Sequence, residues 1–152
     1  MNASKGTRTR LTRAGLGALQ AALAAEQAAA YGYGVVGSHL TGPQAESALA
    51  AYVTHQSGAD RLDELLAAAR AVGVPARVAY QLPHPVSTPG EAVALAVILE
   101  EQVTSAYLGL VARGDRDLRV LGARQARAAA LRAARWRGST VAFPGLPDDA
   151  RR

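Results

Sequence analysis

The sequence predicts an all-α fold, a four-helix bundle of two antiparallel hairpins joined by a long crossover. Alanine-rich segments carry apolar residues at helical spacing, two helix-start patterns divide the chain, and a proline-containing segment lies between the hairpins. Alanine is the strongest helix former, and aromatic residues make up only 5% of the chain, so we expect a thin, tightly packed core. Helices are expected at roughly 12–39, 43–72, 89–113 and 115–137.

The first hairpin joins two helices through about three residues, so the helices should be antiparallel neighbours. One face of the first helix is marked by residues at steps of three or four: Leu16, Leu19, Leu23, Glu26, Ala30 and Tyr33. The second helix begins at Thr41-Gly42-Pro43-Gln44, with threonine as the N-cap, proline in the first turn and glutamine three residues after the cap. Its inner face is expected to hold Ala48, Ala51 or Tyr52, His55, Ala59, Leu62 and Leu66.

The second hairpin has an even shorter connection at Gly114-Asp115. Its first helix starts with a second capping box, Thr88-Pro89-Gly90-Glu91, and Gly138 ends its second helix. The inner faces are expected to hold Leu95, Leu99, Gln102, Ala106 and Leu110, followed by Leu118, Leu121, Gln125, Ala129, Arg132 and Trp136.

The crossover spans about fifteen residues, 73–87, and contains three prolines. A helix of about 26 residues is about 39 Å long at ~1.5 Å per residue. Fifteen extended residues reach about 50 Å, so the crossover can run the full length of the bundle. Two hairpins and one such crossover make up the ferritin-like topology.

We expect a single domain, with the bundle at 12–146, a mobile basic arm at 1–11 and a flexible tail at 147–152. The chain has no cysteine, which excludes disulfides and thiolate metal sites. No apolar run approaches the ~18 residues that span a bilayer, and the basic N-terminus lacks the apolar core of a signal peptide. These features predict a cytoplasmic protein without a membrane partner.

The net charge of +5 is concentrated in the fourth expected helix, whose arginines are Arg119, Arg124, Arg127, Arg132, Arg135 and Arg137. A basic stripe of this kind can follow nucleic-acid phosphates. We favour the simpler interpretation, a solvated helix face whose arginine stems cover an alanine core. Little aromatic interleaving accompanies the stripe, so a nucleic-acid partner is not favoured.

Three side chains at similar depth are candidate metal ligands: Glu26, His55 and Glu100. A bundle that binds two metals uses one glutamate from each of two helices and a Glu-x-x-His pair from each of the others. Glu26 suits the first role, Glu100 or its neighbour Glu101 suits the third helix, and iron or manganese would be the metal. The spacing from Glu26 to Tyr33 also resembles that of ferritin-like first helices.

The metal pattern is incomplete. The residue three positions before His55 is Tyr52 rather than a carboxylate, and the fourth helix has no Glu, Asp or His between 119 and 137. We therefore favour a metal-free polar core, in which Arg132 neutralises a buried glutamate of the first or third helix. Besides the three metal candidates, this core is expected to contain Tyr33, Tyr52, Gln125 and Arg132.

Several segments resemble the actinobacterial ferritin-like proteins of the DUF4439 family. They are 23–34 (LAAEQAAAYGYG), His55 with Asp60 and Leu62, 80–86 (YQLPHPV), 99–101 (LEE), Trp136 and 142–146 (AFPGL). The resemblance covers about 14–146, and its most specific parts are the Tyr-x-Leu-Pro-x-Pro-Val crossover and the Phe-Pro-Gly tail. It implies a ferritin-like four-helix fold and no known activity.

The leading functional prediction is a binding or assembly module without a complete di-metal centre. The alternatives are a metal-dependent oxidase or peroxide-handling protein of di-iron or di-manganese type, and a basic nucleic-acid-associated protein. Its partners are expected to be a second copy of the chain, as a homodimer, or another protein.

Overall fold

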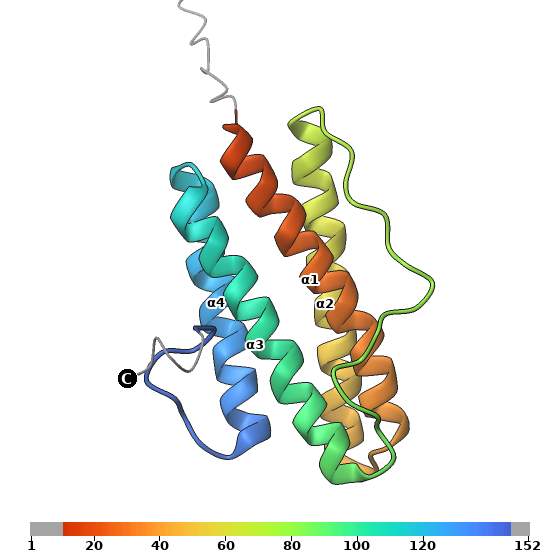
Figure 1. Cartoon of the computed structure of the whole chain (residues 1–152). Helices are drawn as coiled ribbons and strands as arrows, with labels where there is room; N and C mark the ends of the chain where they lie inside the picture. Colours follow the sequence, from red (N-terminus) through yellow and green to blue (C-terminus); the bar gives the residue numbers. More distant parts are fainter. Residues whose placement is uncertain (1–10, 147–152) are drawn as a thin grey trace, which may run out of the picture.

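The computed structural model describes residues 11–146 and contains four helices, no strand being present in that range (Figure 1). The helices are α1 (Arg13–Ser38), α2 (Gly42–Ala68), α3 (Pro89–Arg113) and α4 (Arg116–Arg137). The predicted all-α four-helix bundle is therefore confirmed. The expected basic arm and flexible tail lie almost wholly outside the described residues.

The second helix ends earlier than predicted, at Ala68 rather than near residue 72. Arg70 adopts a left-handed conformation with φ of 59°, which reverses the chain. The backbone N–H of Ala71 then donates to the carbonyl of Leu66, which satisfies one of the last free carbonyls of the helix. This end could not be predicted, because these residues form helices well and a non-glycine residue takes the left-handed position.

Helix caps explain most of the other boundaries. The capping box at the start of α3 is confirmed, because the Thr88 side chain accepts from the Glu91 N–H and the Glu91 side chain accepts from the Thr88 N–H. Thr41 is the N-cap of α2, as predicted, but its side chain makes no capping hydrogen bond. Gly138 ends α4 in the left-handed conformation.

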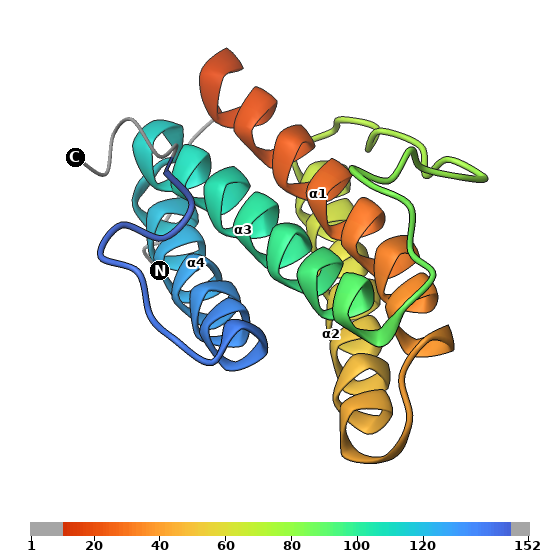
Figure 2. The ribbon, with the colours of Figure 1, turned by 60° about the horizontal axis from the view of Figure 1, so that its bottom comes forward.

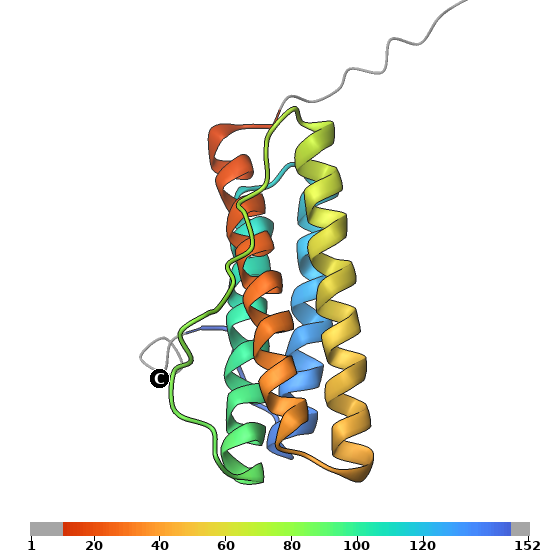
Figure 3. The same ribbon diagram turned by 90° about the vertical axis from the view of Figure 1, so that its right-hand side faces the viewer.

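The helices form two layers, with α1 and α3 in one and α2 and α4 in the other (Figure 3). Helix α1 packs against α2 and α3, and α3 packs against α4. In contrast, no Cα atoms of α2 and α4 approach within 8 Å of each other. Figure 2 also shows these two helices apart from each other.

The crossover runs along the outside of α1 from the end of α2 to the start of α3 (Figure 3). Two glutamine side chains of α1 hold its first part. Gln20 donates to the carbonyl of Val72 and accepts from the N–H of Val74, both at 2.7 Å, and Gln27 donates to the carbonyl of Val74 at 3.0 Å. These bonds give the polar backbone of the loop partners on the helix that it covers.

The core consists mainly of leucine and alanine, and close helix contacts depend on small residues. A Cβ atom at Gly32 of α1 would lie 2.5 Å from a methyl carbon of Leu99, so glycine lets α3 approach. Helix α3 is long and apolar enough to span a membrane by length and composition, a match that the sequence analysis did not anticipate. Its apolar residues pack inside the bundle instead, as those of a core helix do.

Candidate functional site

The three metal candidates meet at the middle of the bundle. Glu26 of α1 is 3% exposed, and His55 of α2 and Glu100 of α3 are fully buried. Glu26 and His55 stand on the inner stripes that the periodicity predicted, whereas Glu100 replaces Gln102 on the inner face of α3, because Gln102 is exposed. Glu100, rather than Glu101, is the inward glutamate of α3, because Glu101 is half-buried and pairs with Arg137 at 2.6 Å.

His55 bridges the two carboxylates. Its Nδ1 lies 2.6 Å from Oε2 of Glu26, and its Nε2 lies 3.2 Å from Oε1 of Glu100. A carboxylate only accepts hydrogen bonds, so each ring nitrogen needs a proton to donate. The geometry therefore favours a doubly protonated, positively charged imidazole between two negative groups.

The electrostatic environment agrees with this assignment. Burial alone would lower the pKa of His55, but its hydrogen bonds to Glu100 and Glu26 and the charges of both carboxylates raise it above its ordinary value. Burial would raise the pKa of Glu100, but its hydrogen bonds with His55 and Arg132 and their positive charges lower it. His55 and Glu100 thus stabilise each other in their ionised forms.

Two tyrosines complete the centre in a crossed pattern. Tyr33 of α1 donates to Oε1 of Glu100 on α3 at 2.8 Å, and Tyr107 of α3 donates to Oε1 of Glu26 on α1 at 2.6 Å. Burial raises the pKa of both hydroxyls, and the neighbouring carboxylates raise it further, so they remain protonated donors. Tyr107 was not among the residues predicted for the polar core.

A signal for Tyr107 was present in the sequence. It follows Glu100 by seven residues, the same spacing that separates Glu26 from Tyr33. Seven residues are close to two helical turns, so each glutamate and its tyrosine share one face of their helix. The two hairpins therefore carry the same Glu-x6-Tyr element, and each tyrosine serves the glutamate of the other hairpin.

Helix α4 supplies the second positive charge, as predicted. Nε of Arg132 donates to Oε1 of Glu100 at 2.7 Å, and its side chain is 19% exposed. Trp136, one turn later, donates from its indole nitrogen to the Tyr33 hydroxyl at 2.8 Å. Since Tyr33 also donates to Glu100, these contacts form a chain of hydrogen bonds from α4 into the centre.

Space for the Glu26 carboxylate comes from a glycine of α2. A Cβ atom at Gly58 would lie 2.7 Å from the carboxylate carbon of Glu26, which is too close for any ordinary contact. Gly58 stands one turn after His55, on the same face of α2. The choice of residue at position 58 is therefore as restricted as the choice of the residues that hydrogen-bond to Glu26.

Two predicted members of the polar core lie elsewhere, and these predictions were wrong. Tyr52 is half-buried, and its hydroxyl accepts a hydrogen bond from Gln56 on the exposed side of α2. Gln125 is also half-buried and makes no hydrogen bond to the centre within residues 11–146. Helix periodicity placed both near the core, but a phase difference of one residue turns a side chain to the helix flank.

The arrangement does not fit a resident iron or manganese ion. A metal needs donor atoms that converge on one position, at about 2.0–2.2 Å from each. The two ring nitrogens of His55 point apart, each toward a different carboxylate, and the Arg132 guanidinium occupies a third side of Glu100. In the described range, no three His, Asp or Glu side chains are arranged to hold a metal. Oε2 of Glu100, which is buried without a hydrogen bond, would offer one donor alone.

Comparisons with known proteins identify the family. The sequence pattern of DUF4439, described as a domain of unknown function, matches residues 18–148. The chain belongs to the DUF4439 family. A solved structure of a conserved hypothetical protein from Mycobacterium tuberculosis is 31% identical, with a TM-score of 0.80 over 82% of this chain and 96% of that chain. No curated protein matches the chain.

Membership in DUF4439 confirms the resemblance that the crossover and the tail motifs indicated. The family carries no assigned activity, and its mycobacterial relative is described only as hypothetical. Any more specific function for this DUF4439 protein must therefore be argued from its own residues.

Proposed function

We propose that this protein is a metal-independent member of the ferritin-like bundles and acts as an assembly module. In this proposal two copies pair through the layer formed by α2 and α4. The observation that supports it best is the charge on that layer: α2 carries exposed acids and α4 carries exposed arginines that have no partner among residues 11–146, and no Cα atoms of the two helices lie within 8 Å of each other.

The ferritin-like part of the proposal rests on topology and on the buried centre. Two hairpins and a crossover place Glu26, His55 and Glu100 at the middle of three helices, where di-metal bundles place their ligands. Here protein cations balance the carboxylates. An imidazolium lies between them, and a guanidinium contacts Glu100. The bundle would therefore stay folded and neutral at its centre without a metal.

The binding part of the proposal rests on a groove between α2 and α4, with a volume of about 580 Å³. Its α2 wall includes Ser47 and Thr54, and its α4 wall includes Leu131, Arg132 and Arg135. The hydroxyls of Ser47 and Thr54 donate to carbonyls of their own helix, so the groove offers few free donors on that side. Leu131 is 45% exposed there, which favours cover by another apolar surface.

A second copy complements this layer in charge. Rotation by 180° about an axis parallel to the helices sets α2 of one copy against α4 of the other, and the same contact then occurs twice. Glu46 of α2 would face Arg135 of α4, and Glu64 and Arg124 add further opposite charges along the two helices; none of these four has a partner among residues 11–146. Ser47 and Arg135 line the same groove, so Glu46 and Arg135 lie at matching heights, whereas Glu64 and Arg124 are offset from each other by about 10 Å along the helix axes at ~1.5 Å per residue.

The size of the layer suits a stable dimer. Helix α2 has 27 residues, so the face is about 40 Å long at ~1.5 Å per residue, and two adjacent helices are about 20 Å wide. Such a face presents about 800 Å² per copy, which is the area that each partner buries in an interface of standard size.

Analytical ultracentrifugation tests the assembly directly. We expect the wild-type chain to sediment as a concentration-dependent dimer and the double variant Arg124→Glu, Arg135→Glu to dissociate at least roughly tenfold more readily. Exposed ion pairs contribute ~0.5 kcal/mol each, and symmetry doubles each pair. A matched reversal on another face of α4, Arg116→Glu with Arg119→Glu, should leave the dimer intact.

A charge exchange makes the test specific to pairing between α2 and α4. The variant Glu46→Arg, Glu64→Arg should also be monomeric, and mixing it with the arginine-reversed variant should restore a heterodimer. A monomer at every concentration of the wild-type chain would contradict the proposal. Strong retention on heparin that falls steeply with salt would instead favour the nucleic-acid alternative.

A further inference from the structure

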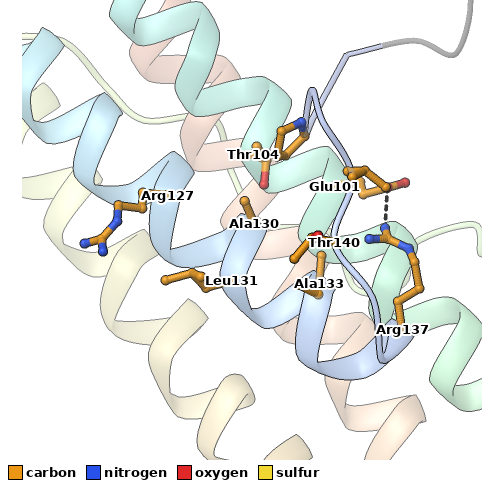
Figure 4. Close-up of a pocket in the computed structure, with 11 residues that line it drawn as sticks. Glu101, Thr104, Arg127, Ala130, Leu131, Ala133, Arg137 and Thr140 are labelled. Carbon is orange, nitrogen blue, oxygen red and sulfur yellow. Dashed lines mark hydrogen bonds and ion pairs between the residues drawn. The ribbon is translucent and has the colours of Figure 1, made fainter. Parts of the chain in front are cut away.

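A second cavity lies on the other side of α4. The chain leaves α4 at Gly138 and turns back over the groove between α3 and α4 (Figure 1). Beneath this C-terminal segment, 138–146, is a cavity of about 250 Å³ (Figure 4). Its walls are mainly apolar and include Ala130, Ala133 and Ala134 of α4, with Val141 and Pro144 of the segment.

The cavity persists because the segment is held away from α4 while the facing side chains are small. Gly145 has a φ of 76°, a conformation that glycine adopts without strain. A Cβ atom there would lie 2.7 Å from Cγ2 of Thr104 and 2.9 Å from the backbone nitrogen of Ser105. Glycine thus lets the segment rest directly on α3, and alanines on α4 leave the space beneath it unfilled.

The two ends of the cavity differ in charge. Figure 4 shows the ion pair of Glu101 and Arg137 at one end, where the two groups lie 2.6 Å apart. Arg127 lies at the opposite end, is exposed, and has no hydrogen bond or ion pair with any residue from 11 to 146. The hydroxyl of Thr104 already donates to the carbonyl of Glu100. The cavity therefore has mainly apolar walls, and the exposed guanidinium of Arg127 beside its open end, which Figure 4 shows directed away from the other labelled residues, is an uncompensated positive charge within the described range.

We propose that this cavity binds a small monocarboxylate with an aromatic or branched aliphatic body, whose carboxylate pairs with Arg127. An apolar cavity of about 150 Å³ holds a benzene molecule, so about 250 Å³ accommodates a ring with a short acidic side chain. The body of the ligand displaces no bound polar group, because the walls around it are aliphatic. A change of rotamer of the exposed Arg127 side chain would bring its guanidinium to the carboxylate at the open end.

This site goes beyond the proposed assembly and does not depend on it. The cavity lies between α3 and α4, whereas the proposed dimer uses Arg124 and Arg135 on the side of α4 that faces α2. Failure of the dimer would leave the cavity proposal standing, and failure of ligand binding would leave the dimer proposal standing.

The test uses 3-phenylpropanoate as the probe and amide chemical shifts of the full chain as the readout. We expect saturable shifts that concentrate at 101–104, 130–137 and 140–144. The uncharged 3-phenylpropanamide should bind about two- to fivefold more weakly, the difference that one exposed ion pair makes. Equal affinity for the acid and the amide would overturn the carboxylate assignment.

Two variants separate the contributions of the charge and the cavity. Arg127→Gln should weaken the acid about two- to fivefold and leave the amide unchanged. Arg119→Gln, which removes an exposed arginine about two turns earlier that lines neither the cavity nor the proposed dimer face, should change neither. Ala130→Leu should fill the cavity and abolish binding of both probes. Unsaturable or dispersed shifts in the wild-type chain, or undiminished binding to Ala130→Leu, would overturn the site.

Discussion

Removing one tyrosine hydroxyl should affect the bundle very differently at the two crossed positions. Tyr33 and Tyr107 are both almost fully buried, and each donates one hydrogen bond to a buried carboxylate. The same change to phenylalanine therefore removes the same chemical group. What differs is the number of donors that the carboxylate oxygen keeps afterwards.

Oε1 of Glu26 accepts from Tyr107 alone, so Tyr107→Phe leaves a buried, negatively charged oxygen without a donor in the described range. A lost hydrogen bond to a charged group costs about 1.5–3 kcal/mol, and we expect ~2.5 kcal/mol here. Oε1 of Glu100 also accepts from His55 and Arg132, so Tyr33→Phe leaves it two donors. We expect a loss of ~1 kcal/mol for that variant.

Urea unfolding followed by circular dichroism measures both losses as changes in the free energy of unfolding. Tyr31→Phe is the control, because its half-buried hydroxyl makes no hydrogen bond to residues 11–146, and it should change stability by less than ~0.5 kcal/mol. Equal losses at Tyr33 and Tyr107, or a larger loss at Tyr33, would refute the reasoning from donor number.

Three further predictions concern the same centre. The pKa of His55 is raised in the folded state, so its contribution to stability is fully present below pH 6.5 and is lost as the pH rises through the folded-state pKa. The pKa of Glu100 is lowered, so its contribution to stability is present above pH 4.5 and is lost as the pH falls through the folded-state pKa. The urea midpoint should therefore be highest between about pH 4.5 and 6.5, and a midpoint that does not change with pH would contradict the charged His55–Glu100 pair. Arg132→Met should destabilise by about 2 kcal/mol in urea unfolding, less than for a fully buried pair because the side chain is partly exposed. Gly58→Ala should destabilise the protein by about 1–3 kcal/mol, because the added methyl group would collide with Glu26. The same substitution at an exposed helical glycine would stabilise the protein, so a raised thermal midpoint for Gly58→Ala would contradict the predicted collision.

Much of the fold was predictable because its signals are local. Caps, prolines and helical periodicity depend on residues a few positions apart, and they placed all four helices and the crossover. The end of α2 was not predictable, because Arg70 takes a conformation that sequence rules reserve for glycine. The groove between α2 and α4 could not be predicted either, because it depends on the distance between the two helices rather than on the local sequence of either one.

The candidate site was predictable in part. Depth along the helices brought Glu26, His55 and Glu100 together correctly, and the lack of a carboxylate on the fourth helix pointed to Arg132 as the compensating charge. Partners across the bundle were harder to predict, because a crossed bond such as Tyr107 to Glu26 joins residues 81 positions apart. The repeated Glu-x6-Tyr spacing was the only local trace of it.

Elemental analysis of the untagged protein, purified after growth with added iron and manganese, tests the central claim that this bundle is metal-independent. Glu26→Ala removes a buried carboxylate of the centre, and Glu101→Ala is the matched control on the surface of α3. The account predicts no metal above background in any of the three proteins. About one or two metals per chain in the wild type, kept by Glu101→Ala and lost in Glu26→Ala, would contradict it and favour the metal-dependent enzyme.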